Sequence, residues 1–166
     1  MVDFRLVGFA GCLVFSFLEE GRIGYFGEGG KKEVGCYDLL IVDDQAGVRR
    51  LLYEAFSEEG YRVELATSGP EAIQKVLRKT PDVILLDNKM PVMSGLETAY
   101  EIRKLNYDVP IILMTAYGEL DITARAQKLG INHYVDKPFD LNEVRQLVKA
   151  SLIESRYKEK YLKEIG

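Results

Sequence analysis

From residue 37 onward the sequence alternates between short apolar runs and longer stretches with a helical period, and this alternation allows few folds. A run of four or five apolar residues fits a strand that is covered on both faces, as in a parallel sheet. Strands that alternate with helices connect through right-handed crossovers, which place helices on both faces of the sheet. The runs predict strands at Leu39–Val42, Val63–Ala66, Val83–Leu86, Ile111–Met114 and around Tyr134–Val135.

The stretches between and after these runs carry the helical period. They predict helices at Val48–Glu59, Pro70–Arg78, Leu96–Lys104, Asp121–Leu129 and from Leu141 onward. Ser68 and Glu71 have the spacing of a capping box at the start of the second helix. Gly60 and Gly130 stand where glycine should end the first and fourth helices. The sequence therefore predicts an α/β fold, a doubly wound parallel sheet of five strands.

The first 36 residues and the last 14 lie outside this pattern. Residues 19–35 hold six glycines and no sustained period, which is typical of a linker. We therefore expect an N-terminal extension at residues 1–36, a globular domain at 37–152 and a helical extension at 153–166. Apolar residues recur every fourth position in the last segment, at Ile153, Tyr157, Tyr161 and Ile165. That stripe fits either a frayed tail or weak self-association, so we expect a monomer or weak homodimer.

The N-terminal extension has three interpretations, namely a membrane-touching arm, a disordered segment or a start codon assigned too far upstream. The apolar segment Leu6–Leu18 is too short to span a bilayer and lacks the features of a signal peptide. Lys32–Val34 can be encoded by a purine-rich string that resembles a bacterial ribosome-binding site, which favours the third interpretation. The intact mass of the native protein would test it. We expect no membrane association.

Polar residues follow the ends of four predicted strands. Asp43 and Asp44 follow the first strand, Asp87 the third, Thr115 the fourth and Lys137 the fifth. Sites in open α/β sheets lie at the carboxyl ends of the strands, so these side chains should converge. Two carboxylates about 4 Å apart repel by roughly 4 kcal/mol at an effective dielectric of about 20, so a cation is expected among them. Oxygen ligands favour Mg²⁺.

A carboxylate beside Mg²⁺ can act as a nucleophile on phosphorus. Phosphoryl transfer needs mainly alignment and neutralisation of the phosphoryl oxygens. We expect Asp87 to be the nucleophile. Lys137 and Thr115 would each contact a phosphoryl oxygen, and the metal would contact another.

Four segments together resemble the bacterial receiver domain of two-component response regulators, from about Tyr37 to Leu152. They are LIVDD at 40–44, LLD at 85–87 with Met90, Pro91 and Gly95, MTA at 114–116 and KPF at 137–139. The resemblance implies a flavodoxin-like strand order of 2-1-3-4-5 and transfer of a phosphoryl group from a partner's phosphohistidine to Asp87. It also implies that Asp44 binds Mg²⁺ directly, Asp43 through water and Lys89 through its backbone carbonyl. The Lys137–Pro138 bond would be cis.

Residues 42–49 and 114–121 further resemble the single-domain regulators of the sporulation phosphorelay. Such regulators pass the phosphoryl group on to a second histidine-bearing protein. The resemblance implies a histidine kinase or a histidine phosphotransfer protein as partner, and Thr115 with Tyr134 as a conformational switch. The bulky side chains of Lys89 and Tyr117 should hinder water at the phosphoryl group. The expected partner surface comprises Gln45, Gly47, Val48, Lys89, Tyr117, Pro138 and Phe139.

Purely structural roles also remain open for several of these residues. Tyr134 could be an ordinary edge-strand aromatic, and Val48 and Leu51 could belong to the core. His133 is the only histidine and fits a partly exposed residue at a strand edge.

The function expected from these features is a phosphorelay intermediate that catalyses its own phosphorylation and dephosphorylation without turning over a substrate. A stand-alone regulator of the chemotaxis type, which signals by binding when phosphorylated, is the main alternative. A Mg²⁺-dependent phosphohydrolase is disfavoured, because such enzymes place an acid two residues beyond the nucleophile and this chain has Lys89 there. The net charge of −4 and the lack of a helix-turn-helix after residue 152 argue against direct nucleic-acid binding. The two cysteines have no metal-type spacing and fit a cytoplasmic protein.

Overall fold

A computed structural model describes residues 3–9, 12–19, 22–26, 37–105, 108–116 and 120–165. The chain divides into two units, Met1–Cys36 and Tyr37–Gly166. Strands β1 (Asp3–Phe9), β2 (Cys12–Glu19) and β3 (Arg22–Phe26) form an antiparallel sheet in the first unit. The linker prediction was wrong for β3, because pairing with β2 can stabilise a five-residue strand that is too short to give a period of its own. For residues 27–36 that prediction lies outside the described residues.

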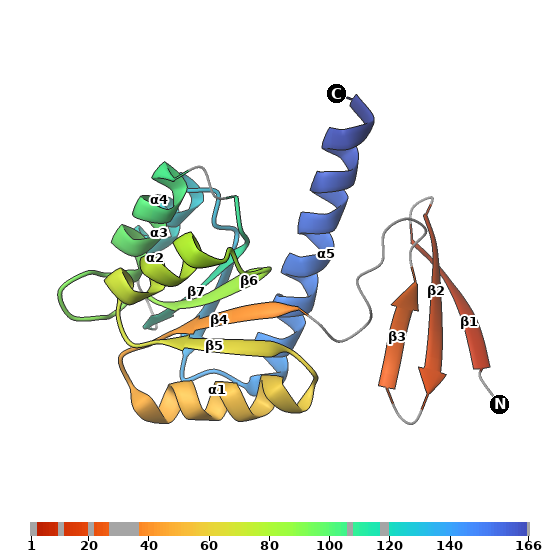
Figure 1. The fold of residues 1–166 in the computed structure, drawn as a ribbon, viewed down its shortest axis with the longest axis horizontal. Coiled ribbons are helices and arrows are strands. Elements are labelled where there is room, and N and C mark those ends of the chain that lie inside the picture. The colour runs from red at the N-terminus through yellow and green to blue at the C-terminus, as the bar shows by residue number, and fades with distance from the viewer. Residues whose placement is uncertain are drawn as a thin grey trace. The chain divides into compact units, whose positions relative to one another are not determined.

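The second unit contains a parallel sheet of five strands in the order β5-β4-β6-β7-β8 (Figure 1). These strands are β4 (Asp38–Val42), β5 (Arg62–Ala66), β6 (Val83–Asp87), β7 (Ile111–Ala116) and β8 (His133–Lys137). The helices are α1 (Ala46–Glu58), α2 (Gly69–Arg78), α3 (Gly95–Lys104), α4 (Leu120–Gln127) and α5 (Leu141–Ile165). The predicted flavodoxin-like order is confirmed.

Two apolar cores lie on opposite faces of the sheet. Residues of α2, α3 and α4 pack on one face, and these three helices lie together in Figure 1. Residues of α1 and α5 pack on the other face. Successive residues of β6 contribute to the two cores in turn, Leu85 to the α1/α5 side and Leu86 to the α2–α4 side. This double coverage explains why the central strands are continuous apolar runs.

Glycine ends α1 and α4 as predicted. Gly60 has φ 87° and Gly130 has φ 69°, both in the left-handed region. After α1 the N–H of Tyr61 donates to the carbonyl of Phe56 and the N–H of Gly60 to that of Ser57, which is the Schellman pattern. The Tyr61 ring then packs edge-on against the Phe56 ring at 5.3 Å.

The capping box predicted at α2 was wrong. Ser68 makes no side-chain cap hydrogen bond, and Glu71 accepts from the backbone N–H and the hydroxyl of Thr67 instead, at 2.8 Å each. The complete capping box lies at α3, where Ser94 accepts from the N–H of Glu97 and the Glu97 carboxylate accepts from the N–H of Ser94. Ser68 and Glu71 have the spacing of a capping box, but the Glu71 carboxylate accepts its hydrogen bonds from Thr67 instead of from Ser68.

Helix α1 settles one open interpretation of the sequence. Leu52 is completely buried, whereas the Leu51 residue is 45% exposed and Val48 is partly buried at the edge of the α1/α5 core. A core role for Leu51 was therefore wrong, because a surface helix has room for only one buried stripe.

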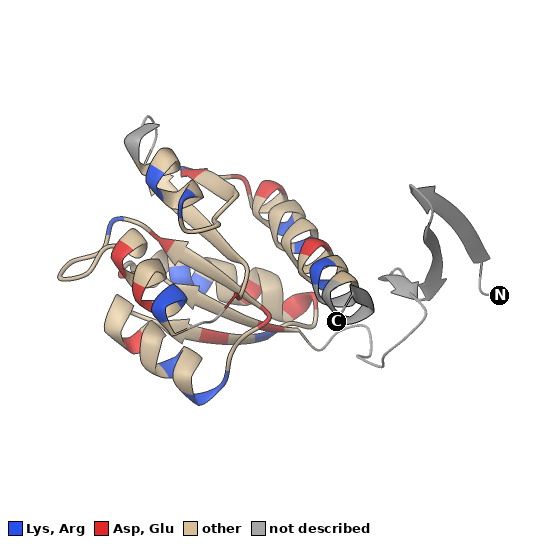
Figure 2. Cartoon of the chain, turned by 90° about the horizontal axis from the view of Figure 1, so that it is seen from above, with Lys and Arg blue, Asp and Glu red and all other residues tan. Residues whose placement is uncertain are grey.

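Helix α5 continues past residue 152, the predicted end of the globular domain, into the predicted helical extension. Side chains of this extension contact residues in or next to the strands of the sheet. Glu154 pairs with His133 at 2.9 Å, the Arg156 guanidinium lies 4.7 Å from the Tyr37 ring centroid, and Lys158 pairs with Asp108. Acidic and basic residues are interspersed along this helix (Figure 2). In the described part of the stripe Ile153, Tyr157 and Tyr161 are exposed. The side chain of Ile165 lies outside the described residues. None of the helices in the described part of the chain is long and apolar enough to cross a membrane.

Candidate active site

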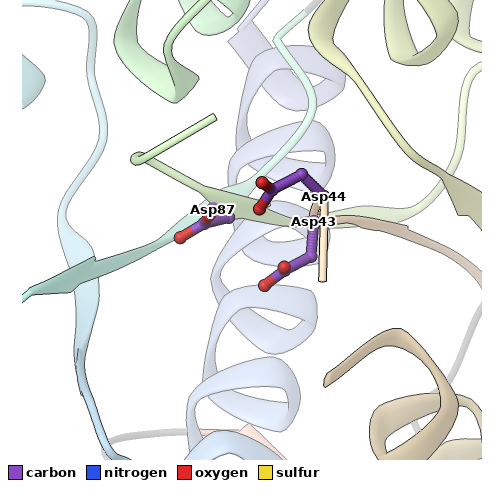
Figure 3. Close-up of side chains that lie close together, drawn as sticks. All are labelled: Asp43, Asp44 and Asp87. Carbon is purple, nitrogen blue, oxygen red and sulfur yellow. The ribbon is translucent and has the colours of Figure 1, made fainter. Parts of the chain in front are cut away.

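Three carboxylates gather at the carboxyl end of the sheet (Figure 3). Asp43 and Asp44 directly follow β4, and Asp87 is the last residue of the neighbouring strand β6. One carboxylate oxygen from each of the three lies within 4.8 Å of those of the other two. The convergence predicted from the strand ends is therefore observed.

Lys137 links two of these carboxylates. Its Nζ lies 2.7 Å from Oδ2 of Asp43 and 2.9 Å from Oδ1 of Asp87. The other oxygen of Asp43 accepts from the backbone N–H of Gln45 at 2.8 Å. The Asp43 side chain is completely buried and that of Asp87 is 2% exposed, whereas Asp44 is exposed. The site thus has two buried carboxylates, Asp43 and Asp87, paired with Lys137, and one carboxylate, Asp44, that is open to solvent.

The electrostatics of the site follow from this burial. Burial raises the pKa of Asp87 above its ordinary value and the charge of Asp43 adds to the effect, while Lys137 opposes both. Burial by itself would lower the pKa of Lys137, but its bonds to Asp43 and Asp87 outweigh burial and raise it. Lys137 is therefore held in its charged form, and Asp87 is a carboxylate whose charge is only partly compensated.

One atom of the site has the chemistry of a cation ligand. Oδ2 of Asp87 is buried and has no hydrogen-bond partner among the described residues. A buried carboxylate oxygen without a partner is costly, and a hard cation that kept several waters would satisfy it. Asp43, Asp44 and Asp87 supply only oxygen ligands, which suits Mg²⁺.

Thr115 makes a contact that the sequence did not reveal. It lies at the end of β7, is 7% exposed, and donates its hydroxyl to Oδ1 of Asp136 at 3.0 Å. Asp136 was not among the predicted site residues. Only the register could have indicated it, because Thr115 and Asp136 are direct neighbours across β7 and β8.

The loop after Asp87 is closely fitted to the site. The N–H of Gly95 donates to the carbonyl of Asn88 at 3.0 Å, and a Cβ on Gly95 would lie 2.4 Å from the carbonyl oxygen of Asp87. Only glycine fits there. In the same loop Val92 has φ 70° and is fully exposed.

The remaining predicted residues surround this edge. Gln45, Gly47, Lys89 and Pro138 are exposed, while Val48 and Phe139 are partly buried against the α1/α5 core. Tyr117 lies outside the described residues. The Lys137–Pro138 bond is cis, as predicted.

The aromatic and imidazole side chains of β8 also have partners. The hydroxyl of Tyr134 donates to the carbonyl of Ile131 at 2.6 Å, and the ring packs against the α2–α4 core. The His133 side chain is 18% exposed at the start of the edge strand β8, as predicted, but its Glu154 partner was not foreseen.

Comparisons with known proteins agree with this geometry. Residues 39–149 match the family described as the response regulator receiver domain. The chain is 43% identical over 114 residues to sporulation initiation phosphotransferase F of Bacillus subtilis, a match that covers 69% of this chain and 92% of that protein. It is 40% identical over 114 residues to the regulatory protein AtoC of Escherichia coli, again over 69% of this chain but only 25% of that protein.

Solved structures show the same relationship. A CheY-like receiver domain protein from Methanospirillum hungatei superimposes with a TM-score of 0.71 at 27% identity, covering 74% of this chain and 98% of that one. The chemotaxis protein CheY4 of Vibrio cholerae gives a TM-score of 0.67 at 27% identity, covering 70% and 98%. The fold, the gathered carboxylates with Lys137 and these matches lead to one conclusion: the chain belongs to the receiver domain family of two-component response regulators.

Proposed function

We propose that the chain takes a phosphoryl group from a partner's phosphohistidine onto Asp87 in a Mg²⁺-dependent reaction. The chain then relays this group to a second histidine-bearing protein, or signals by binding a partner protein. The observation that carries this proposal is the Asp87 carboxylate. It is buried beside two other carboxylates, has one oxygen without a hydrogen-bond partner in the described part of the chain, and lies 2.9 Å from a charged ammonium.

The residues divide the chemistry among them. A carboxylate oxygen of Asp87 attacks phosphorus while the P–N bond to the partner's histidine breaks, and the electron pair stays on the histidine nitrogen. Lys137 already contacts Asp87, so a small movement of its Nζ would let it hold a phosphoryl oxygen. The Thr115 hydroxyl would donate to another oxygen once it is free of Asp136.

Receiver domains bind Mg²⁺ in their acidic site, and we assign its ligands here to Asp43, Asp44, Asp87 and the backbone carbonyl of Lys89. When bound, Mg²⁺ would supply positive charge for the transferring phosphoryl oxygens. Asp43 is held by Lys137 and the Gln45 N–H, which suits a role through water, while the exposed Asp44 can bind directly.

The relay role rests on similarity. The chain covers 92% of a protein named as a phosphotransferase of sporulation initiation. A relay needs a phosphoryl group that survives until the next partner arrives, and the exposed Lys89 beside Asp87 would hinder water. We assign the same role to Tyr117, and a switch role to Thr115 with Tyr134.

Receiver domains interact with histidine kinases or phosphotransfer proteins. We propose that the partner's helix docks on Gln45, Gly47, Val48, Pro138 and Phe139 together with Lys89 and Tyr117. Exposed and half-buried residues at the edge that holds Asp87 support this surface. We further propose that the chain acts in the cytoplasm as a monomer or weak homodimer and contacts neither nucleic acid nor membrane. Its net charge of −4 supports the absence of nucleic-acid binding, because nucleic acid is bound by basic surfaces.

The test is chemical phosphorylation. The full chain is incubated with acetyl phosphate and Mg²⁺, and the intact mass is measured over time. We expect the mass of one phosphoryl group to be added to the wild-type chain and to Asp108→Asn, a surface control, but not to Asp87→Asn. Continuous release of phosphate over many turnovers would instead favour a phosphohydrolase, and an adduct on Asp87→Asn would refute the assignment of the nucleophile.

A further inference from the structure

We propose that Asp136 is a positioning residue that holds the Thr115 hydroxyl away from Asp87 in the unphosphorylated chain and so opposes phosphoryl capture. The inference rests on the proposed function, because it assigns a regulator to the same site. It starts from the hydrogen bond between Oγ1 of Thr115 and Oδ1 of Asp136 at 3.0 Å.

The sheet itself brings the two residues together. Thr115 and Asp136 are paired in the parallel register of β7 and β8, so their side chains leave the same face of the sheet. Val135 is buried in the α1/α5 core, which turns Asp136 and Tyr134 toward the opposite face. Thr115 follows Met114, another residue of the α1/α5 core, and turns the same way. The hydrogen bond is therefore built into the strand register.

A hydroxyl has one proton to donate. While Thr115 donates it to Asp136, Thr115 cannot donate to a phosphoryl oxygen on Asp87. The two hydrogen bonds exclude each other, so any state in which Thr115 binds the phosphoryl group must first break the bond to Asp136. A group that stabilises one of two exclusive states shifts the population toward it.

The charge of Asp136 acts in the same direction. Among the described residues Asp136 forms no ion pair, and Thr115 is the one side-chain donor recorded for its carboxylate. The neighbouring Lys137 is directed to Asp43 and Asp87 instead. The carboxylate of Asp136 thus neutralises no cation in this part of the chain, and its contact is with the hydroxyl that phosphoryl capture needs.

Two variants separate the hydrogen bond from the charge. Asp136→Ala removes both, whereas Asp136→Asn removes the charge and keeps an oxygen that can accept from Thr115. With acetyl phosphate and Mg²⁺ we expect the rate of adduct formation on the full chain to rise about tenfold in Asp136→Ala, since hydrogen bonds to charged groups are among the stronger ones. Asp136→Asn should stay within about threefold of wild type, because the hydrogen bond persists in weaker form.

A double-mutant comparison shows whether Asp136 acts through Thr115. We expect a Thr115→Val background to be slower throughout. In that background Asp136→Ala should change the rate by less than about twofold, because there is no hydroxyl to release. A readout without metal or phosphodonor is the Thr115 side-chain rotamer measured by three-bond couplings in NMR. We expect one rotamer in wild type and Asp136→Asn, and averaging in Asp136→Ala.

Three results would overturn the inference: equal rates in wild type and Asp136→Ala, equal acceleration by Ala and Asn, or an effect of Asp136→Ala that persists without the Thr115 hydroxyl. Failure of the proposed function looks different. The wild-type chain would then form no adduct on Asp87, and that result would overturn both proposals.

Discussion

Lys137 is the residue on which the stability of the site most depends. It is the one cation recorded within salt-bridge distance of both buried carboxylates in the described part of the chain. Removing one member of a buried ionic cluster is far more destabilising than replacing the whole cluster, because the remaining charges stay buried.

Replacing Lys137 by methionine should therefore lower the free energy of unfolding by about 3 kcal/mol near pH 7. The loss should shrink as the pH falls below about 7. Burial already raises the pKa of Asp87, and a group whose folded pKa is raised stabilises the fold at low pH and loses that contribution as the pH rises through it. Urea denaturation near pH 7 and at lower pH measures the effect.

Lys75→Met is a matched control for this prediction. The Lys75 side chain is also 20% exposed, but its partners Glu64 and Glu71 are exposed surface carboxylates at 3.7 Å. We expect a loss below about 1 kcal/mol from that change. Equal losses in the two variants, or a Lys137→Met loss that does not depend on pH, would contradict the prediction.

Val92 stores strain beside the site. A β-branched residue at φ 70° is unfavourable, and full exposure means that no packing compensates for it. Val92→Gly should raise the free energy of unfolding by about 1 kcal/mol, since a left-handed residue other than glycine costs roughly 1–2 kcal/mol. Val92→Ala, which keeps the same backbone strain, should change it little. Thermal denaturation of the two variants checks this, and an equal gain in both would exclude strain as the cause.

At the scale of elements, the two serines at helix starts give a paired test. Ser94→Ala removes a complete capping box and should destabilise the protein by about 1 kcal/mol. Ser68→Ala removes no side-chain cap bond and should be close to neutral. Chemical denaturation of both variants compares them directly, and a larger loss at Ser68 would mean that its hydroxyl has a role in solution which the structure does not show.

The elements of the sheet could be predicted because their signals are local. Each apolar run became a strand and each periodic stretch a helix, and the boundaries moved by three residues or fewer. The carboxylates were predictable because parallel strands end at one edge. Asp136 was missed because its importance comes from its register with Thr115, and register is not a local property. The hydrogen bonds of Glu71 were also not predictable. Glu71 bonds to Thr67 instead of Ser68, and this depends on the backbone geometry at the helix start.

At the scale of the whole molecule, α5 joins parts of the chain that are far apart in sequence. A chain ending at Leu152 would lose the contacts of Glu154, Arg156 and Lys158 with His133, Tyr37 and Asp108. Because these are surface contacts, we expect a loss of about 1–2 kcal/mol in total. Thermal unfolding measures it, and light scattering on the same two proteins reports whether the exposed stripe pairs chains. Equal stability of the shortened and full chains would mean that residues 153–166 are a frayed tail that does not stabilise the domain.

The ionic link from Lys137 to Asp43 joins residues 94 positions apart. Lys137 ends β8, the last strand of the receiver sheet in the sequence, and Asp43 directly follows β4, the first. During synthesis, Asp43 and Asp87 leave the ribosome well before their counter-ion does. A nascent chain that has not yet released β8 contains the nucleophile Asp87 but lacks Lys137, whose charge offsets the cost of burying the Asp87 carboxylate. Competence for phosphorylation should therefore arise only after β8 has been released, so a receiver domain without β8 could not draw phosphoryl groups from its partners.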